Sequence, residues 1–238
     1  LQRLLVDVHR AQNGSMLTLF TNRREMERCF DEVQPQLKVD DLRVVCQKWG
    51  VSVKGLRDDF LADEHLSLFA LKSFWEGFDA PGATLKGVVI PKLPFAKPTD
   101  PLSCERAARD DQAWRRYVLP AAVLETKQAA GRLIRKADDT GVLILADRRL
   151  LTKSYGKAFL NLHLPRDHQV MTAAEIVADL ERSNNGVTQG DPLVRMGKRE
   201  DKITRAAHIK RHTRGTSNEI SFSVLDAAKN ALEGDDDG

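Results

Sequence analysis

Several features that would assign a protein to a class at once are missing or scarce in this chain of 238 residues. Its three cysteines are odd in number and lack CxxC spacing, which excludes a disulfide scaffold and a cysteine-based metal site and is typical of the reducing cytoplasm. No apolar run approaches the roughly 20 residues of a membrane-spanning helix. The net charge is only +3, so overall charge gives no reason to expect nucleic acid. We therefore expect a cytoplasmic chain with no membrane partner.

Motifs that would bind a nucleotide or a metal within one chain are also absent. No GxxxxGK[ST] sequence occurs, so the chain has no P-loop to hold a triphosphate and its Mg²⁺. The six histidines show no ligand spacing with the cysteines, and we predict no metal site. There is neither a nucleophile elbow nor a spacing that supports a Ser-His-Asp triad. The chain therefore cannot by itself bind a triphosphate in the P-loop manner, and it contains none of these nucleophile motifs.

Apolar runs alternate with amphipathic segments along the chain. The predicted strands are residues 16–20, 42–46, 67–71, 85–90 and 142–145. The predicted helices are residues 1–13, 23–37, 53–63, 102–136 (with Pro120 able to kink or divide it) and 173–182. Continuous apolar runs are typical of parallel strands buried on both faces, so the sequence predicts an α/β fold with a parallel sheet between helices. Ligands bind such sheets at the carboxyl ends of the strands, which here are residues 21, 73–82, 92–95 and 147–149.

The composition changes near residue 195. Residues 195–214 contain eight Lys or Arg and two acidic residues, whereas residues 215–238 contain one Lys and six acidic residues. We therefore predict one domain over residues 1–194 and a charged, partly disordered tail over residues 195–238, with a basic arm that contacts nucleic acid as the alternative for the tail. The chain begins with Leu1 and no signal peptide follows, so we expect a piece of a longer protein.

One predicted helix carries three polar side chains on the same face. Gln128 and Arg132 are four residues apart and Arg135 follows three later, so the three lie within about 60° of one another. Two guanidiniums and an amide can form a fork for an anion such as phosphate. Gly131 lies between them, and a glycine inside a helix costs about 1 kcal/mol and usually indicates close approach of another group. The alternative is an exposed basic stripe.

Two further segments come directly after predicted strands. Residues 73–82 (SFWEGFDAPG) form a loop rich in Gly and Pro that places Glu76 and Asp79 at the edge of the sheet. Carboxylates there can hold a nucleotide hydroxyl or a water molecule. Residues 21–24 (TNRR) follow the first strand at a helix start, where a hydroxyl, backbone N–H groups and two arginines suit a phosphate. An ordinary turn and an N-cap with exposed arginines are the alternatives.

In order and spacing, these segments resemble motifs IV, V and VI of superfamily 2 helicases, and in detail the bacterial DinG-like side of the DinG/XPD group. Residues 16–24 (MLTLFTNRR) are similar to motif IV, residues 73–82 to motif V, and residues 117–135 (YVLPAAVLETKQAAGRLIR) to motif VI. Residues 89–100 (VIPKLPFAKPTD) and 141–156 (GVLILADRRLLTKSYG) are similar to the sequences that follow motifs V and VI. The resemblance covers about residues 1–182, which is most of the predicted domain.

This resemblance implies the second RecA-like motor domain of an ATP-dependent DNA helicase that acts in repair or replication. ATP with Mg²⁺ would be bound mainly by the first motor domain, which carries the Walker A motif and, in many members, an iron–sulfur cluster; neither is in this chain. The expected partners are single-stranded DNA and that first motor domain. The chain alone is expected to hydrolyse no ATP.

The resemblance also implies roles for single residues. Arg135 would be the arginine finger on the γ-phosphate, with Arg132 supporting it and Gln128 positioning the attacking water or the phosphate. The nucleotide cleft would be lined by Glu76, Gly77, Asp79 and Gly131. The single strand would be contacted by Thr21, Asn22, Arg23, Ser73 and Lys92. The intact Gln-Arg-Arg set favours an active motor over the alternative of a nucleic-acid-binding or regulatory module without ATP turnover, and a nuclease would need acidic residues from elsewhere.

Overall fold

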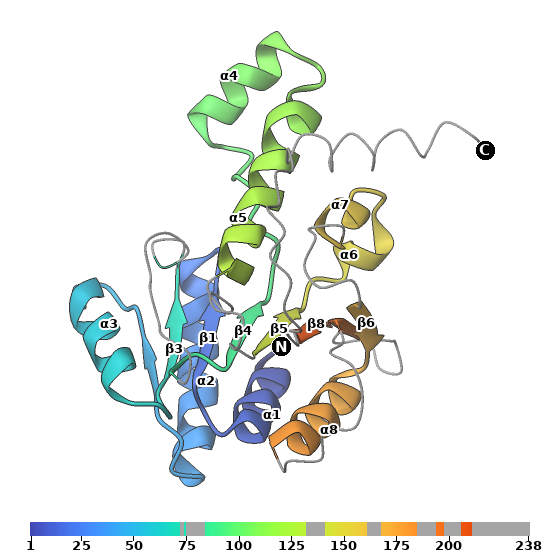
Figure 1. Cartoon of the computed structure of the whole chain (residues 1–238). Coiled ribbons are helices and arrows are strands. Elements are labelled where there is room, and N and C mark those ends of the chain that lie inside the picture. The colour runs from blue at the N-terminus through green and yellow to red at the C-terminus, as the bar shows by residue number, and fades with distance from the viewer. Residues whose placement is uncertain are drawn as a thin grey trace, which may run out of the picture.

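The computed structural model describes residues 1–71, 74, 84–131, 141–160 and 168–184, together with two short strands at 194–197 and 206–210. All five predicted strands are present: β1 (Met16–Leu19), β2 (Val44–Cys46), β3 (Ser67–Ala70), β4 (Gly87–Ile90) and β5 (Val142–Leu145). They are parallel and lie in the order β2-β3-β1-β4-β5. Figure 1 shows this sheet between helices. The predicted α/β class and RecA-like architecture are confirmed.

Helices cover both faces of the sheet because alternate strand residues point to opposite sides. Met16 packs in one core with α1 (Gln2–Gln12), α2 (Arg23–Val39) and α8 (Ala173–Asn184). Leu17 and Leu19 pack in the other core with α3 (Val53–Ala62), α5 (Leu119–Gly131) and α7 (Gly156–Leu160). Every residue of β1, β3, β4 and β5 is buried, as continuous apolar runs predict.

Side chains fix where several helices begin. Asn22, Ser52 and Asp100 precede α2, α3 and α4 (Pro101–Arg109), and each accepts a hydrogen bond from the backbone N–H three residues later, at 3.2, 3.2 and 2.9 Å. Such caps satisfy N–H groups that the helix itself leaves without a partner. Among the described residues, no helix is both long enough and apolar enough to cross a bilayer.

The helix expected over residues 102–136 is interrupted earlier than predicted. It consists of α4, a π-helical turn η3 (Trp114–Val118) and α5, and the chain between α4 and η3 is extended at Asp110. Pro120 lies in the first turn of α5, directly after the π-helical turn. Proline has no N–H to donate to the carbonyl four residues earlier, so a wider turn beside it relieves the clash. The proline therefore does not separate the two helices; Asp110 does.

Five elements of the second half were not predicted, and one of them is the helix α7 described above. α6 (Arg149–Thr152) follows β5, and three short strands extend the sheet: β6 (His168–Met171), β7 (Val194–Gly197) and β8 (Ala206–Lys210). β8 pairs antiparallel with both β5 and β6. β8 and most of β7 fall within the segment predicted as a tail, so part of that segment joins the sheet. The division into residues 1–194 and 195–238 stays a prediction.

A buried histidine makes the stability of this fold depend on pH. The His9 side chain is inaccessible to solvent, its Nδ1 lies 2.6 Å from the Leu5 carbonyl oxygen, and its ring packs edge-on against Phe69. Burial lowers the pKa of His9 to about 4, although the hydrogen bond to Leu5 opposes the shift. The unfolded chain, with a histidine pKa near 6.5, therefore takes up a proton that the folded chain does not.

We expect the free energy of unfolding to fall by about 2 kcal/mol between pH 6 and pH 4.5 because of His9 alone. The measurement is urea unfolding at several pH values for the wild type and for His9→Phe, which removes the titrating group and keeps a ring against Phe69. His65→Gln, which changes an exposed histidine, is the control and should keep the wild-type pH dependence. Equal pH dependence in wild type and His9→Phe would contradict this account.

Candidate functional site

Neighbouring parallel strands end at one edge of the sheet, and polar residues follow them. Thr21 and Asn22 come after β1, Lys92 after β4 and Asp147 after β5. β4 lies between β1 and β5 in the sheet, so these segments leave the strands side by side. Three residues predicted to contact DNA are therefore brought to the carboxyl edge, where a parallel sheet binds its ligands.

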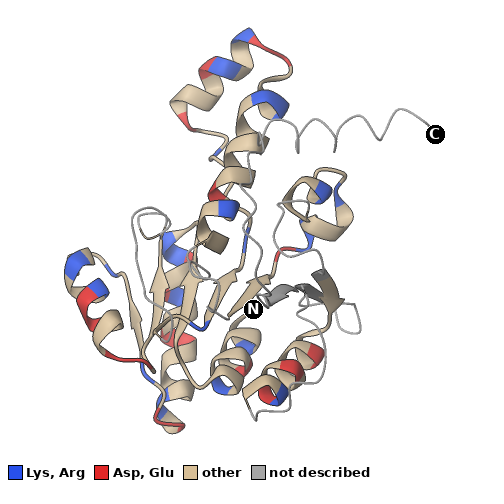
Figure 2. Ribbon diagram, in the orientation of Figure 1, with Lys and Arg blue, Asp and Glu red and all other residues tan. Residues whose placement is uncertain are grey.

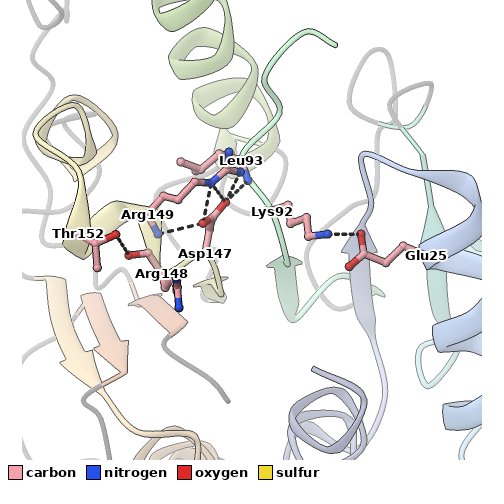
Figure 3. A network of polar contacts seen from close by, with 7 residues as sticks. All are labelled: Glu25, Lys92, Leu93, Asp147, Arg148, Arg149 and Thr152. Atoms are coloured by element: carbon pink, nitrogen blue, oxygen red, sulfur yellow. Dashed lines mark hydrogen bonds and ion pairs between the residues drawn. The ribbon is translucent and has the colours of Figure 1, made fainter. Parts of the chain in front are cut away.

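Lys92 is linked to the first turn of α2. Its Nζ lies 2.8 Å from Glu25 Oε2, as Figure 3 shows, and about half of its side chain is exposed. The Asn22 side chain is occupied in capping the same helix, and Thr21 is half-buried beside it. The pair of Lys92 and Glu25 thus holds the segment after β4 against the start of α2.

Arg23 points toward a different part of the edge. Its Nη1 donates a hydrogen bond to the Gln47 carbonyl oxygen, at 2.9 Å, beyond the end of β2. Its guanidinium also lies over the ring of Trp49, 4.9 Å from the centroid, and Trp49 is 86% exposed. About a third of the Arg23 side chain stays accessible, so the position suits a contact near β2 rather than beside Lys92.

Asp147 connects the ends of β4 and β5. Its carboxylate accepts hydrogen bonds from the Leu93 N–H (2.9 Å), the Arg149 N–H (3.0 Å) and the Arg149 guanidinium, all drawn in Figure 3. Burial would raise the pKa of Asp147, but the hydrogen bonds from the Arg149 guanidinium and from the two backbone N–H groups outweigh it, so the pKa lies below its usual value. A charged carboxylate therefore fixes residues 92–95 against α6.

A groove with a volume of about 820 Å³ opens at this edge, between residues 92–98 and the helices α4 and η3. Thr21, Asn22 and Lys92 contribute to its wall. Sequence reasoning missed the remaining polar and aromatic members, chiefly Lys97, Arg106, Trp114 and Tyr155. They lie on four different segments, and the available signals were that Lys97 comes soon after a strand and that residues 89–100 and 141–156 resemble helicase sequences.

The residues predicted to act on ATP are described only in part. Gln128 and Gly131 are exposed near the end of α5, while Ala129 and Ala130 between them are buried against the sheet. Apart from its chain neighbours and the backbone of its own helix, no described atom lies within 4 Å of where a Cβ on Gly131 would be, so the described residues do not make the close approach expected there. The other predicted positions lie outside the described residues: Ser73, Glu76, Gly77, Asp79, Arg132 and Arg135.

The cysteines show no sign of metal binding. Cys29 and Cys46 are buried, and burial raises the pKa of the Cys46 thiol to about 12, while Cys104 is exposed on α4. In the part of the chain that the structure describes, no group of three or more His, Cys, Asp or Glu side chains could hold an ion.

Comparison with known proteins gives one consistent result. The chain matches a family model described as the helicase C-terminal domain over residues 5–165, which includes all three helicase-like segments. It is 36% identical over 185 residues to the ATP-dependent DNA helicase YoaA of Escherichia coli. It is 35% identical over 176 residues to the ATP-dependent helicase DinG of Mycobacterium tuberculosis, and 33% over 168 residues to the 3'-5' exonuclease DinG of Bacillus subtilis.

These alignments cover 75%, 72% and 68% of this chain. They cover only 28%, 26% and 18% of the three relatives, so the chain spans about a quarter or less of the length of the proteins it matches.

Proposed function

We propose that this chain, which belongs to the helicase C-terminal domain family and is DinG-like, is the second motor domain of a longer ATP-dependent DNA helicase. The family match over residues 5–165 is the observation that carries this proposal, because it spans the segments similar to motifs IV, V and VI in one continuous alignment. A role in DNA repair or replication in the cytoplasm is part of the proposal.

The chain would supply one wall of an ATP site. Without a P-loop it has no cradle of its own for a triphosphate, so ATP with Mg²⁺ would be held mainly by the first motor domain. The amide of Gln128 is exposed at the end of α5 and is accessible to a second domain. In the proposed site Arg135 contacts the γ-phosphate, Arg132 supports it, and Glu76, Gly77, Asp79 and Gly131 line the cleft.

The chemistry asked of these residues is electrostatic. Negative charge develops on the phosphoryl group as it transfers, and a fixed guanidinium stabilises that charge. Because Arg135 would come from a separate domain, hydrolysis would depend on closure of the cleft between the domains. Closure on ATP binding and opening on release would then alternate the grip on the strand and move the enzyme along it.

The DNA grip would use the carboxyl edge of the sheet. The proposed contacts are Thr21, Asn22, Arg23, Ser73 and Lys92. Thr21, Asn22 and Lys92 share one groove wall, and Arg23 extends the surface toward β2. Contacts of this kind reach the phosphate backbone, so they would hold a strand of any sequence.

The isolated chain gives a direct test. It should bind oligothymidine weakly, with an affinity that falls as salt rises, because the contacts are to phosphates. It should hydrolyse no ATP, since it lacks the P-loop. The measurements are fluorescence anisotropy of a labelled oligonucleotide at several salt concentrations and a phosphate-release assay. Clear ATP hydrolysis by the isolated chain would overturn the assignment of a half-site.

A further inference from the structure

Helix α4 stands away from the body of the molecule. None of its residues is buried, and Leu102 is 57% exposed although it is apolar. Figure 1 shows the helix projecting beyond the end of the sheet, beside η3 and the start of α5. The groove of about 820 Å³ lies between this helix and residues 92–98, and its size is within the range of small-ligand sites. A second hollow of about 480 Å³ shares Lys97 and Arg106 with it.

One wall of the groove is an aromatic ring held in a fixed orientation. Trp114 packs against Phe95 and Tyr155, with centroid distances of 5.8 and 5.1 Å. Phe95 is in turn held edge-on by Phe159, at 5.7 Å, and lies under the Arg149 guanidinium. Trp114 nevertheless keeps 40% of its surface exposed. A rigid and partly open indole ring is suited to stacking a flat ligand.

The charge of the groove favours an anion. Its lining has four basic residues, Lys92, Lys97, Arg106 and Arg149, and one acidic residue, Glu25; Lys92 pairs with Glu25 and Arg149 pairs with Asp147, which leaves Lys97 and Arg106. Lys97 and Arg106 are exposed and form no ion pair within the described part of the chain. Arg106 lies over the ring of Tyr117, 4.5 Å from its centroid. Figure 2 shows Lys and Arg residues on α4 and on the helical turn that follows it.

We infer that this groove binds nucleotides of single-stranded DNA, with a base stacked on Trp114 and phosphates beside Lys97 and Arg106. The inference rests on the proposed function and adds residues to it, since Thr21, Asn22 and Lys92 line the same groove. Stacking on a protein ring needs a base that is free of its neighbours, which a single strand offers and a duplex does not. A basic lining disfavours a basic or purely apolar peptide as the occupant.

Two sets of variants test the contacts. Trp114→Ala should weaken oligothymidine binding by the 238-residue chain about tenfold, and Trp114→Phe should restore most of the affinity because a ring remains. Lys97→Gln and Arg106→Gln should each lower the slope of log affinity against log salt by about 0.7, the amount expected for one phosphate contact to a single strand. Lys54→Gln on α3, a change of the same charge far from the groove, should leave the slope unchanged.

Cys104 reports on occupancy of the groove. It lines the groove and is exposed, with its Sγ 3.2 Å from the Pro98 carbonyl oxygen, whereas Cys29 and Cys46 are buried. Oligothymidine should slow alkylation of Cys104 by iodoacetamide, and a duplex of equal length should do so much less.

The outcomes distinguish a failure of the proposed groove site from a failure of the proposed function. Binding of oligothymidine without protection of Cys104, and with Trp114→Ala at wild-type affinity, would overturn the groove and leave the proposed function standing. Absence of any oligothymidine binding would overturn both. Slow alkylation of Cys104 without DNA would mean that another segment of the protein covers the groove. Equal protection of Cys104 by a duplex would mean that the groove is not specific for a single strand. Either result overturns the inference.

Discussion

Replacing Arg135 with alanine in the longer protein that we propose to be a helicase is expected to lower ATP hydrolysis stimulated by single-stranded DNA by about 10³-fold or more. The expectation follows from the proposed role of this guanidinium on the γ-phosphate, where its charge matters most in the transition state. Binding of ATP should change much less than turnover, because the first motor domain would hold most of the nucleotide.

The measurement compares steady-state ATP hydrolysis with and without oligothymidine for the wild type, Arg135→Ala and Arg3→Ala. Arg3 is a suitable control because its side chain is 96% exposed on α1 and its pair with Asp7 is a surface pair of small effect. Arg3→Ala should keep wild-type turnover. Arg135→Lys should recover little, since a lysine cannot make the planar, bidentate contact of a guanidinium.

Other results would lead to different conclusions. Wild-type turnover in Arg135→Ala, with DNA stimulation intact, would keep the motor assignment and remove the finger from Arg135. A full-length wild type without any DNA-dependent turnover would favour the alternative of a nucleic-acid-binding module that has the helicase fold and no ATP hydrolysis.

Much of the sheet could be predicted because its strands have a strong local signal. β5 (Val142–Leu145) has the bounds that its apolar run predicted, and β1 differs by one residue. The later strands have no such signal: β8, with the sequence AAHIK, lies in a basic stretch and takes its place by pairing with β5 and β6. Its pairing is a tertiary interaction, which periodicity in one segment cannot show.

The candidate site shows the same division between local and tertiary information. Thr21 and Lys92 could be predicted at the carboxyl edge, because each follows an apolar strand. The packing of Trp114 against Phe95 and Tyr155 could not be predicted, since it joins three segments that are separated in the sequence. For the same reason, the position of Asp147 after β5 gave no indication that it accepts the Leu93 N–H.

Asp147→Ala is expected to lower the free energy of unfolding by about 3 kcal/mol. The Asp147 side chain is only 6% exposed, and its loss leaves the Leu93 N–H and the Arg149 guanidinium without their acceptor. Removing one member of a buried ion pair costs about 3–5 kcal/mol; the low end applies here because the Arg149 side chain keeps 37% of its surface in solvent. Urea unfolding measures this change. Asp58→Ala on α3, an exposed carboxylate, should stay within about 0.5 kcal/mol of the wild type.

The sign of the pH dependence distinguishes this account from simple loss of packing. A carboxyl group whose folded pKa lies below its unfolded value stabilises the fold above the unfolded pKa, near 3.9, and that stabilisation is lost as the pH falls through the folded pKa. Asp147→Asn keeps the shape of the side chain and removes its charge. The difference in stability between wild type and Asp147→Asn should therefore be full at pH 7 and shrink below about pH 4. A difference that stays constant down to pH 3 would contradict the charge-based account.

Asp147 also connects stability with the DNA site. Its hydrogen bond to Leu93 holds the segment from which Phe95 supports Trp114, so losing it should loosen the groove before it unfolds the sheet. We expect Asp147→Ala, which removes the acceptor of the Leu93 N–H, to weaken oligothymidine binding at pH 7 under conditions where the chain is still folded by circular dichroism. The double variant that also carries Arg149→Ala should lose less free energy of unfolding than the two single variants lose together. The reason is that the double variant has no unpaired guanidinium left beside the loop. Full additivity would mean that Asp147 and Arg149 act independently, and that the ion pair is not what positions this loop.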